Sequence, residues 1–278
     1  MLKAVSAWRS STVEALAIPC RSEHELRLMR EAGRIVAAVH EHLKSLLRPG
    51  MGTAELADIA EAHIRRAGGE PVLRGYGAGE VSATGFPAAI CVSLNDEAVH
   101  GIPQPGRHLR AGDLVGLDIA VGYEGWMADA AWTHVCAAEL LPEAQREWRE
   151  RLVRCAEAAL WAGIEQARPG RCVGDIGAAI ARVVTAAGFT VLRELTGHGI
   201  GRALHEAPVV LSYGRPGTGW RLEPGMTLAL EVAIAAGSWR VRREADGWTV
   251  RTWDGSPAAH YEHTIAITTD AADVLTLP

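Results

Sequence analysis

LRAGDLVGLDIAV, residues 109–121, and LEPGMTLALEVAI, residues 222–234, are two versions of one sequence pattern. Each begins with a glycine turn and continues as an apolar run with strand character. At the same register, the first stretch carries Asp118 and the second carries Glu231. An unpaired charge inside an apolar strand is costly, and a metal ion is the usual partner of clustered carboxylates. The pattern therefore predicts two related strands, each placing an acid at a pseudo-symmetric point of one fold.

The duplication extends to the segments that precede these strands. Leu47–Gly50 reads LRPG and Ala167–Gly170 reads ARPG, and each is followed by a helical pattern that ends at a glycine, Gly68 or Gly188. Pro-Gly helix ends are common by themselves, but constant spacing over several positions favours a true internal repeat. We expect a pseudo-twofold repeat of helix–helix–strand halves.

The rest of the chain fits one α+β domain. Residues 1–20 are expected to form a flexible N-terminal extension, and residues 21–278 a single domain, because no linker or change of composition divides them. A capping box at Ser22–Glu25 predicts the start of the first helix. The last third, from Val191, reads mostly as strands and turns. These patterns predict helices that cover a curved antiparallel sheet.

The composition excludes several classes of protein. The 278 residues carry a net charge of −5 without long runs of one sign, which argues against a nucleic-acid partner. No apolar stretch reaches membrane length, and residues 1–20 lack the continuous apolar region of a signal peptide. The five cysteines have no CxxC spacing and indicate reduced, mostly buried thiols. We therefore expect a cytoplasmic protein with no membrane partner.

Four acids lie in strand-like segments. Asp118 and Asp129 flank one predicted hairpin, in which residues on opposite strands can meet face to face. Glu262 lies in YEHTIAI, residues 261–267, where alternation places it on the same face as Thr264. The simpler interpretation is a surface acid, a turn acid and an edge-strand glutamate facing solvent, and for Glu262 alone that interpretation is the better one. With Glu231 added, the four acids favour a metal site.

Three histidines lie in glycine-flanked segments that are expected to be loops. His198 is in TGHGIG, residues 196–201, His205 follows seven residues later, and His100 is in AVHGIP, residues 98–103. Glycines let a backbone and a ligand approach closely. TGHGIG is not a dinucleotide fingerprint, because no strand–turn–helix with a later acid frames it. A lone histidine is more often structural than functional, but three such segments suggest a site.

The acids and His198 together form a candidate ligand set whose donor atoms are mostly oxygens, with one nitrogen. Its members are Asp118, Asp129, His198, Glu231 and Glu262. This chemistry suits two divalent ions such as Mn, Fe(II) or Co, with zinc as a further candidate. Two ions about 3.5–4 Å apart can share a bridging hydroxide and polarise a carbonyl, an arrangement that hydrolyses amides.

These residues also resemble a known family. NDEAVHGIP at residues 95–103, GHGIGR at 197–202 and YEHT at 261–264, with the acids in order between them, closely resemble methionine aminopeptidase from about residue 20 to the C-terminus. The short spacing between His205 and Glu231 leaves no room for the helical insertion of the type 2 enzymes, so the chain is similar to type 1. The resemblance implies the pita-bread fold, whose pseudo-twofold symmetry agrees with the repeat.

The resemblance also implies roles for the ligand set. Asp118, Asp129, His198, Glu231 and Glu262 would bind the metal ions. Asp129 and Glu262 would bridge them, and Glu231 would also be the proton shuttle for the bridging hydroxide that attacks the scissile carbonyl. The substrate α-amine would lie near the Asp118-side metal, which would restrict cleavage to N-terminal residues.

Two histidines would act on the substrate. His100 would contact the scissile amide or the residue after it. His205 would hydrogen-bond the carbonyl oxygen as it becomes a gem-diolate, and a neutral donor of this kind stabilises charge that appears only in the transition state. The full set of residues expected to bind substrate is His100, His205, Phe86, Cys91 and Trp248.

Several positions depart from the family pattern. Val232-Ala233 follows Glu231 where the family usually has Pro-Met, which removes a rigid point of the backbone. Ala130 follows Asp129 where threonine is frequent, which removes a hydroxyl beside a ligand.

The methionine pocket is also expected to differ. Ala83 and Leu204 align where larger aromatic residues are common, and Glu80 aligns near a frequent thiol. Fewer aromatic walls would weaken contacts with the methionine thioether, each worth roughly 0.3–1.5 kcal/mol.

Three functions therefore compete. The first is a dinuclear-metal aminopeptidase that removes initiator methionine from peptides and nascent proteins, preferring a small second residue. The second is a specialised aminopeptidase or X-Pro dipeptidase-like enzyme of the same fold, which the pocket changes favour. The third is a non-enzymatic binding protein, against which the complete ligand set argues. For the first function we expect a monomer that contacts the ribosome transiently.

Overall fold

The structure is a computed structural model that describes residues 18–278. The N-terminal extension expected at residues 1–20 therefore lies almost entirely outside the described residues. The helices are α2 (Glu23–Leu46), α3 (Thr53–Arg66), α4 (Glu143–Gln166) and α5 (Val173–Ala186), with a short 3₁₀ turn, η1 (Ala138–Leu140). The strands are β1 (Glu70–Pro71), β2 (Cys91–Leu94), β3 (Glu97–Val99), β4 (Leu114–Tyr123), β5 (Trp126–Val135), β6 (Thr190–Val191), β7 (Thr196–Gly199), β8 (Glu206–Leu211), β9 (Thr227–Ala235), β10 (Val241–Arg243), β11 (Val250–Thr252), β12 (Ala258–Ile267) and β13 (Ala272–Val274).

The internal repeat is confirmed by the helices. α2 and α4 each have 24 residues, and α3 and α5 each have 14. Gly68 and Gly188 follow α3 and α5 with φ of 81° and 79°, the left-handed conformation that glycine adopts without a steric penalty. Similar lengths and similar stop signals thus give the two halves the same helical frame.

The predicted capping box begins α2. The Ser22 side chain accepts a hydrogen bond from the Glu25 backbone N–H, and the Glu25 carboxylate accepts one from the Ser22 N–H at 2.8 Å. Together these bonds satisfy two of the otherwise unpaired donors at the helix start. The apolar face of α2 then buries Met29, Val36 and Leu43 against β4 and β5.

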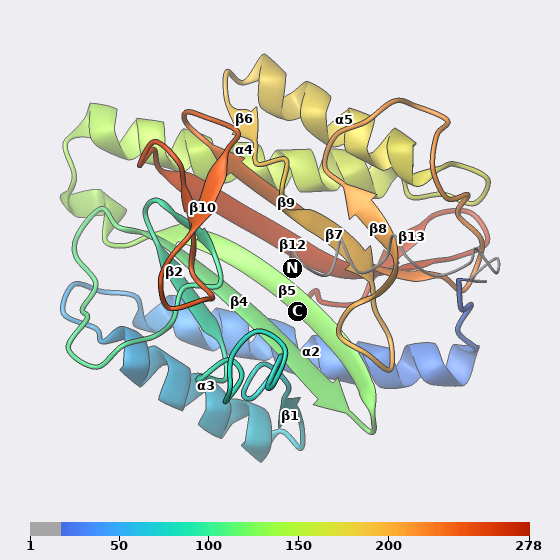
Figure 1. The fold of residues 1–278 in the computed structure, drawn as a ribbon, viewed down its shortest axis with the longest axis horizontal. Coiled ribbons are helices and arrows are strands. Elements are labelled where there is room, and N and C mark those ends of the chain that lie inside the picture. Colours follow the sequence, from blue (N-terminus) through green and yellow to red (C-terminus); the bar gives the residue numbers. More distant parts are fainter. Residues whose placement is uncertain (1–17) are drawn as a thin grey trace.

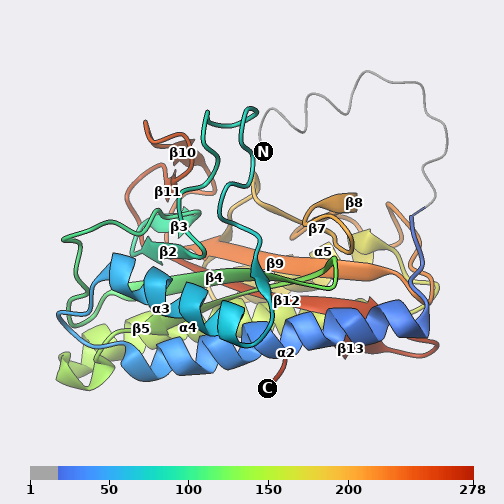
Figure 2. The same cartoon turned by 90° about the horizontal axis from the view of Figure 1, so that it is seen from below.

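Helices α2, α3, α4 and α5 lie on one face of a sheet that has ten strands within the described residues (Figures 1 and 2). Its main strand order is β1-β4-β5-β12-β9-β7-β8, and β2, β6 and β13 pair with β4, β9 and β12. A smaller sheet, β10-β11-β3, lies on the opposite face from the helices. One hydrophobic cluster joins α2 and α3 to β4 and β5, and a second joins α4 and α5 to β9 and β12. The expected α+β architecture is thereby confirmed.

Strand β12 lies at the centre of the sheet. It pairs with β5 on one side and β9 on the other, so the interpretation of Glu262 as a solvent-facing edge residue is wrong. Its neighbour His263 points to the helix side, where its ring lies against Trp132 and Trp161. Glu262 consequently faces away from the helices, and its side chain is 2% exposed.

Two composition-based expectations can be compared with the structure. All five cysteines are free, and Cys91, Cys136 and Cys155 are buried. Within residues 18–278, no helix combines the length and the apolar character needed to cross a bilayer.

Candidate metal and active site

Four adjacent strands each deliver one acid to the face of the sheet opposite the helices. β4 carries Asp118, β5 carries Asp129, β9 carries Glu231 and β12 carries Glu262. In the β4–β5 hairpin, Asp118 is opposite Ala131 and Asp129 is opposite Ala120, so the two aspartates are diagonal neighbours on one face. The hairpin thus brings both carboxylates toward the same point, as the sequence predicted.

His198 enters the site from β7, so this residue lies in a strand and the expectation of a loop is wrong. A Cβ on Gly197 would come within 2.5 Å of the Ala229 carbonyl oxygen, so glycine here permits close packing of β7 on β9. The His198 Nδ1–H donates to the Gly199 carbonyl at 2.9 Å. Its Nε2 then carries a lone pair, and that atom lies 3.3 Å from Glu231 Oε1. Two lone pairs that face each other require a cation or a proton between them.

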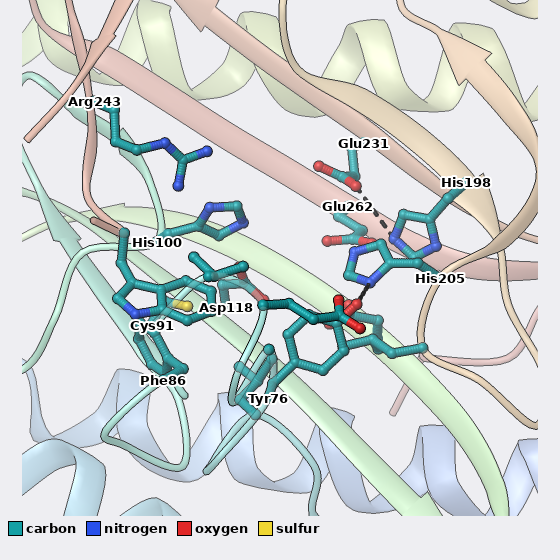
Figure 3. A pocket seen from close by; sticks show the side chains of 17 residues that line it. Tyr76, Phe86, Cys91, His100, Asp118, His198, His205, Glu231, Arg243 and Glu262 are labelled. Atoms are coloured by element: carbon teal, nitrogen blue, oxygen red, sulfur yellow. Dashed lines mark hydrogen bonds and ion pairs between the residues drawn. The ribbon is translucent and has the colours of Figure 1, made fainter. Parts of the chain in front are cut away.

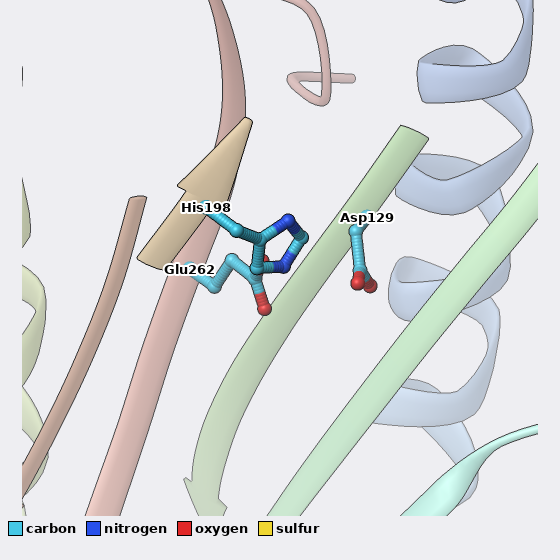
Figure 4. A group of neighbouring side chains, drawn as sticks. All are labelled: Asp129, His198 and Glu262. Carbon is cyan, nitrogen blue, oxygen red and sulfur yellow. The ribbon is translucent and has the colours of Figure 1, made fainter. Parts of the chain in front are cut away.

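The donor atoms fit divalent metal ions. Asp129, His198 and Glu262 each offer a ligand atom within 4.8 Å of the others, and Figure 4 shows their side chains converging. Asp129 Oδ1 and Glu262 Oε1 are buried without a hydrogen-bond partner in the described structure. Buried carboxylate oxygens are normally satisfied, so these two atoms indicate cation ligands. Carboxylates with one imidazole suit ions such as Mn, Fe(II), Co or Zn.

The electrostatics of the metal-free cluster lead to the same conclusion. Burial raises the pKa of Asp118 to about 6, and burial with neighbouring carboxylates raises the pKa of Asp129 and Glu262 well above their usual range. Burial also acts on Glu231, but the His198 and His260 rings outweigh it and hold its pKa below its usual range. Four charges therefore cannot coexist here without added cations, while Glu231 stays anionic.

His260 belongs to this site, and sequence reasoning missed it. Its Nε2 lies 3.6 Å from Glu231 Oε2 and 3.9 Å from Glu262 Oε2, and it has no hydrogen-bond partner in the described structure. Its position two residues before Glu262 puts both side chains on one face of β12. The same alternation rule could therefore have identified it.

His205 lies beside the ligand cluster and is oriented by a tyrosine. Its ring centre is 4.2 Å from that of His198, and its Nδ1 lies 2.5 Å from the Tyr76 hydroxyl. Burial lowers the pKa of His205 to about 3, and burial raises the pKa of Tyr76. Near neutral pH the protonated hydroxyl donates to Nδ1, which leaves Nε2–H of a neutral His205 as the free donor. No sequence pattern pointed to Tyr76.

His100 lines the same cavity in a strained conformation. Its φ of 57° is unusual for a residue with a side chain, and such strain concentrates at functional positions. Its Nδ1 is buried without a hydrogen-bond partner in the described structure. Burial lowers the pKa of His100 to about 4, so the ring is neutral at pH 7.

An apolar pocket adjoins the acids (Figure 3). Phe86, Cys91 and Trp248 line it as expected, and the Phe86 and Trp248 rings meet edge to face at 5.4 Å. Leu204 and Glu80 also line the cavity. The expectation that Ala83 belongs to the methionine pocket is wrong. Ala83 is exposed and does not line the cavity, because the segment between Tyr76 and Val81 faces the cavity instead.

The sheet compensates for the two departures from the family pattern, Val232-Ala233 after Glu231 and Ala130 after Asp129. Val232 continues β9 as a buried residue opposite Tyr261, so the strand ladder itself fixes the backbone after Glu231. The Thr264 hydroxyl accepts a hydrogen bond from the Asp129 N–H and donates one to the Asp129 carbonyl, both at 2.8 Å. A hydroxyl from β12 thus supports the Asp129 backbone, although Ala130 has none.

Comparisons with known proteins show the family of this chain. A family model described as metallopeptidase family M24 matches residues 27–269. Methionine aminopeptidase 1 of Bacillus subtilis is 44% identical over 259 residues, which cover 93% of this chain and 99% of that protein. The methionine aminopeptidase of Clostridium perfringens is 41% identical over 92% of this chain and 98% of its own.

Solved structures show the same relationship. The methionine aminopeptidase of Thermotoga maritima matches with a TM-score of 0.87 and 37% identity, covering 94% of this chain and 100% of that one. A prolidase of Pyrococcus furiosus has a TM-score of 0.70 at 19% identity, covering 96% of this chain and 67% of that one, and so shares the fold. The pita-bread fold implied by the resemblance is confirmed. The chain therefore belongs to metallopeptidase family M24 and, within it, is a relative of the methionine aminopeptidases.

Proposed function

We propose that this protein is a metal-dependent aminopeptidase that removes N-terminal methionine from peptides and nascent proteins, preferring a small second residue. One observation carries the proposal: four strands and β7 bring Asp118, Asp129, His198, Glu231 and Glu262 together beside an apolar pocket. The relatives named methionine aminopeptidase support the choice of substrate.

Those five residues would hold two divalent ions, for which Mn, Fe(II) and Co are the first candidates and Zn a further one. When bound, the ions would lower the pKa of water so that hydroxide is available near neutral pH, and would polarise the scissile carbonyl. Asp129 and Glu262, which each have one buried carboxylate oxygen without a hydrogen-bond partner in the described residues, would be ligands of these ions.

Glu231 is the proposed proton carrier. Its carboxylate is anionic and 13% exposed, so it remains accessible from the cavity. It would accept a proton from the attacking water as the oxygen–carbon bond forms. It would then give this proton to the departing amine as the carbon–nitrogen bond breaks.

The two cavity histidines would act as neutral groups on the substrate. His205, whose Nδ1 is occupied by the Tyr76 hydroxyl, would donate Nε2–H to the carbonyl oxygen as negative charge develops there. His100 would contact the scissile amide or the next residue. The free α-amine would lie near the metal on the Asp118 side, which would explain a requirement for a free N-terminus.

A peptide panel tests this proposal. Metal-stripped protein would receive Mn, Co, Fe(II) or Zn and then X-Ala-Ser peptides in which X is Met, Leu, Ala or Glu. Metal-dependent release of methionine above all other residues is expected. No release from folded protein with any ion would contradict the proposal.

Altered first-residue specificity is the second candidate, and Leu204 and Glu80 in the cavity wall favour it. Preference for leucine or another residue in the same panel would support this specialised aminopeptidase. The X-Pro dipeptidase-like form has less support, because the prolidases share only the fold. A monomer, a cytoplasmic location and a transient ribosome contact remain predictions.

A further inference from the structure

Strands β10 and β11 deliver a positive charge to the otherwise acidic cavity. Arg243, at the end of β10, and Trp248, in the turn before β11, both line the cavity. Figure 3 shows the Arg243 guanidinium reaching in above His100. Burial is the main reason for the low pKa of His100, and the charge of Arg243 adds a smaller lowering. The guanidinium is therefore close to the group proposed to contact the amide.

Arg243 has no acidic partner among residues 18–278. Its Nη1 donates to the Gly247 carbonyl at 2.7 Å, and this is its one side-chain hydrogen bond within those residues. The nearest acids of the hairpin are already engaged. Glu244 pairs with Arg242 at 3.2 Å and with Arg251 at 3.3 Å, and Asp246 accepts hydrogen bonds from the Thr249 hydroxyl and backbone. The hairpin thus holds a half-buried guanidinium in place without neutralising it.

The simplest alternative is that Arg243 merely balances the carboxylates of the metal site. Charge balance of that kind would show as an ion pair, and within residues 18–278 the site carboxylate Glu231 pairs with His198 and His260 instead. A guanidinium has five N–H donors in a planar fork, and its best partner is a carboxylate bound through two parallel hydrogen bonds. The unused donors of Arg243 fit such a partner in the cavity.

We infer that Arg243 binds a carboxylate of the substrate on the leaving-amine side of the scissile bond. This inference rests on the proposed aminopeptidase function, in which His100, beside Arg243, contacts the scissile amide or the residue after it. The carboxylate belongs either to the free C-terminus of a short peptide or to an acidic side chain soon after the methionine. Arg243 is then a specificity-determining residue that favours anionic substrates.

Two matched pairs of peptides distinguish the sources of the carboxylate. The first pair is Met-Ala-Ser as the free acid and as the C-terminal amide. The second is Met-Ala-Asp-Ser-amide and Met-Ala-Asn-Ser-amide. The metal-loaded wild-type enzyme should cleave the charged member of at least one pair with about tenfold higher kcat/KM, mostly through KM. The pair that responds identifies the source.

Variants assign this preference to one side chain. Arg243→Gln should bring the charged-to-neutral ratio close to one, and Arg243→Lys should keep part of it, since lysine retains the charge without the fork. Arg242→Gln is the matched control, because this exposed neighbour pairs with Glu244, and the ratio should not change. The lysine variant keeps the test valid if the glutamine variant does not fold.

Three results would overturn the inference. A wild-type ratio close to one in both pairs, with methionine released from all four peptides, would remove the role of Arg243 and leave the proposed function intact. A charged-to-neutral ratio of kcat/KM that is unchanged in Arg243→Gln would also remove the role of Arg243 and leave the proposed function intact. Failure to cleave any of the four peptides would overturn both the inference and the proposed function.

Discussion

Glu231 and Glu262 lie directly opposite each other on neighbouring strands at the centre of the sheet. Like charges in this position destabilise a sheet, and here both side chains are buried or nearly so. Ions or protons between the two carboxylates would relieve this repulsion. The pair is therefore expected to lower the stability of the metal-free protein, as is common at functional sites.

Replacing Glu262 by glutamine should stabilise the metal-free protein. The raised pKa of Glu262 means that the folded protein keeps a proton that the unfolded chain loses above its ordinary pKa of 4.5. Stability is then lost as pH rises from 4.5 through the folded pKa, and an amide avoids this loss. The Tm of Glu262→Gln should exceed that of wild type, by about 2–4 °C for each kcal/mol relieved, and more at pH 8 than at pH 5.

The same variant should bind less metal, which calorimetric titration with Mn would measure. Glu223→Gln, at an exposed glutamate, is the control and should change neither the Tm of the metal-free protein nor the binding of Mn. A lower Tm for metal-free Glu262→Gln at pH 8 would show that the two carboxylates do not repel each other.

His205→Ala should lower kcat by about 10²–10³-fold and change KM little, since the proposed bond forms in the transition state. Tyr76→Phe should lower kcat by about tenfold, because Nδ1 loses its donor and the ring can present a lone pair at Nε2 instead. Steady-state kinetics on Met-Ala-Ser would measure both. Tyr213→Phe, outside the cavity lining, is the matched control. An effect confined to KM would contradict these roles.

An aromatic residue at position 204 should improve the methionine pocket. Leu204 is buried in the cavity wall, so Leu204→Phe would add contacts to the thioether and raise kcat/KM for Met-Ala-Ser by about 2–12-fold. Ala83→Phe should have no effect, because Ala83 is exposed and outside the lining. If Ala83→Phe improves turnover and Leu204→Phe does not, the assignment of the pocket walls is wrong.

Acid stability should depend on His40 on the helix side of the sheet. Burial lowers the pKa of His40 from 6.5 to about 3, while its ring stacks on Trp132 and its Nε2 bonds the Ala130 carbonyl at 3.0 Å. Below pH 6.5 the His40 ring binds a proton in the unfolded chain but stays neutral in the folded protein. The free energy of unfolding therefore decreases as pH falls toward 3. Each pH unit in this window should cost about 1.4 kcal/mol from this one group.

Urea unfolding of the metal-free protein between pH 6 and pH 4 would measure this slope. His40→Gln should make the slope shallower by about 1.4 kcal/mol per pH unit, whereas His24→Gln, at an exposed histidine, should not. Parallel slopes for wild type and His40→Gln would contradict the prediction.

The sequence predicted the parts of the site that depend on strand register. The repeat predicted Asp118 and Glu231, and the hairpin predicted Asp129 beside Asp118. Alternation placed Glu262 on one face of its strand but did not say that this face is buried. His260 obeys the same rule, but it is not flanked by glycine and so lacks the signal that marked the other histidines. The local patterns were thus sufficient to single out the four acids, whereas their individual roles as metal ligands came from the resemblance and stay predictions.

The loops were less predictable for a physical reason. Tyr76, Arg243 and Ala83 lie in or next to segments whose course is set by contacts with distant residues, such as the bond between Tyr76 and His205. The periodicity of a sequence contains no information on such contacts. The alignment therefore predicted Ala83 in the pocket, whereas in the structure this residue is exposed. Departures beside Glu231 and Asp129 were visible in sequence, but their compensation by β12 required the sheet.

The proposed function depends on the binding of divalent ions by these side chains and on proton transfer by Glu231. The most direct measurement is methionine release from Met-Ala-Ser against equivalents of Mn added to metal-stripped protein, for wild type and Glu231→Gln, with bound metal and circular dichroism recorded in parallel. We predict that wild-type activity rises with bound ion up to two per chain, and that folded Glu231→Gln releases almost no methionine. Activity that is independent of metal, or near-normal turnover by Glu231→Gln, would contradict the proposed function.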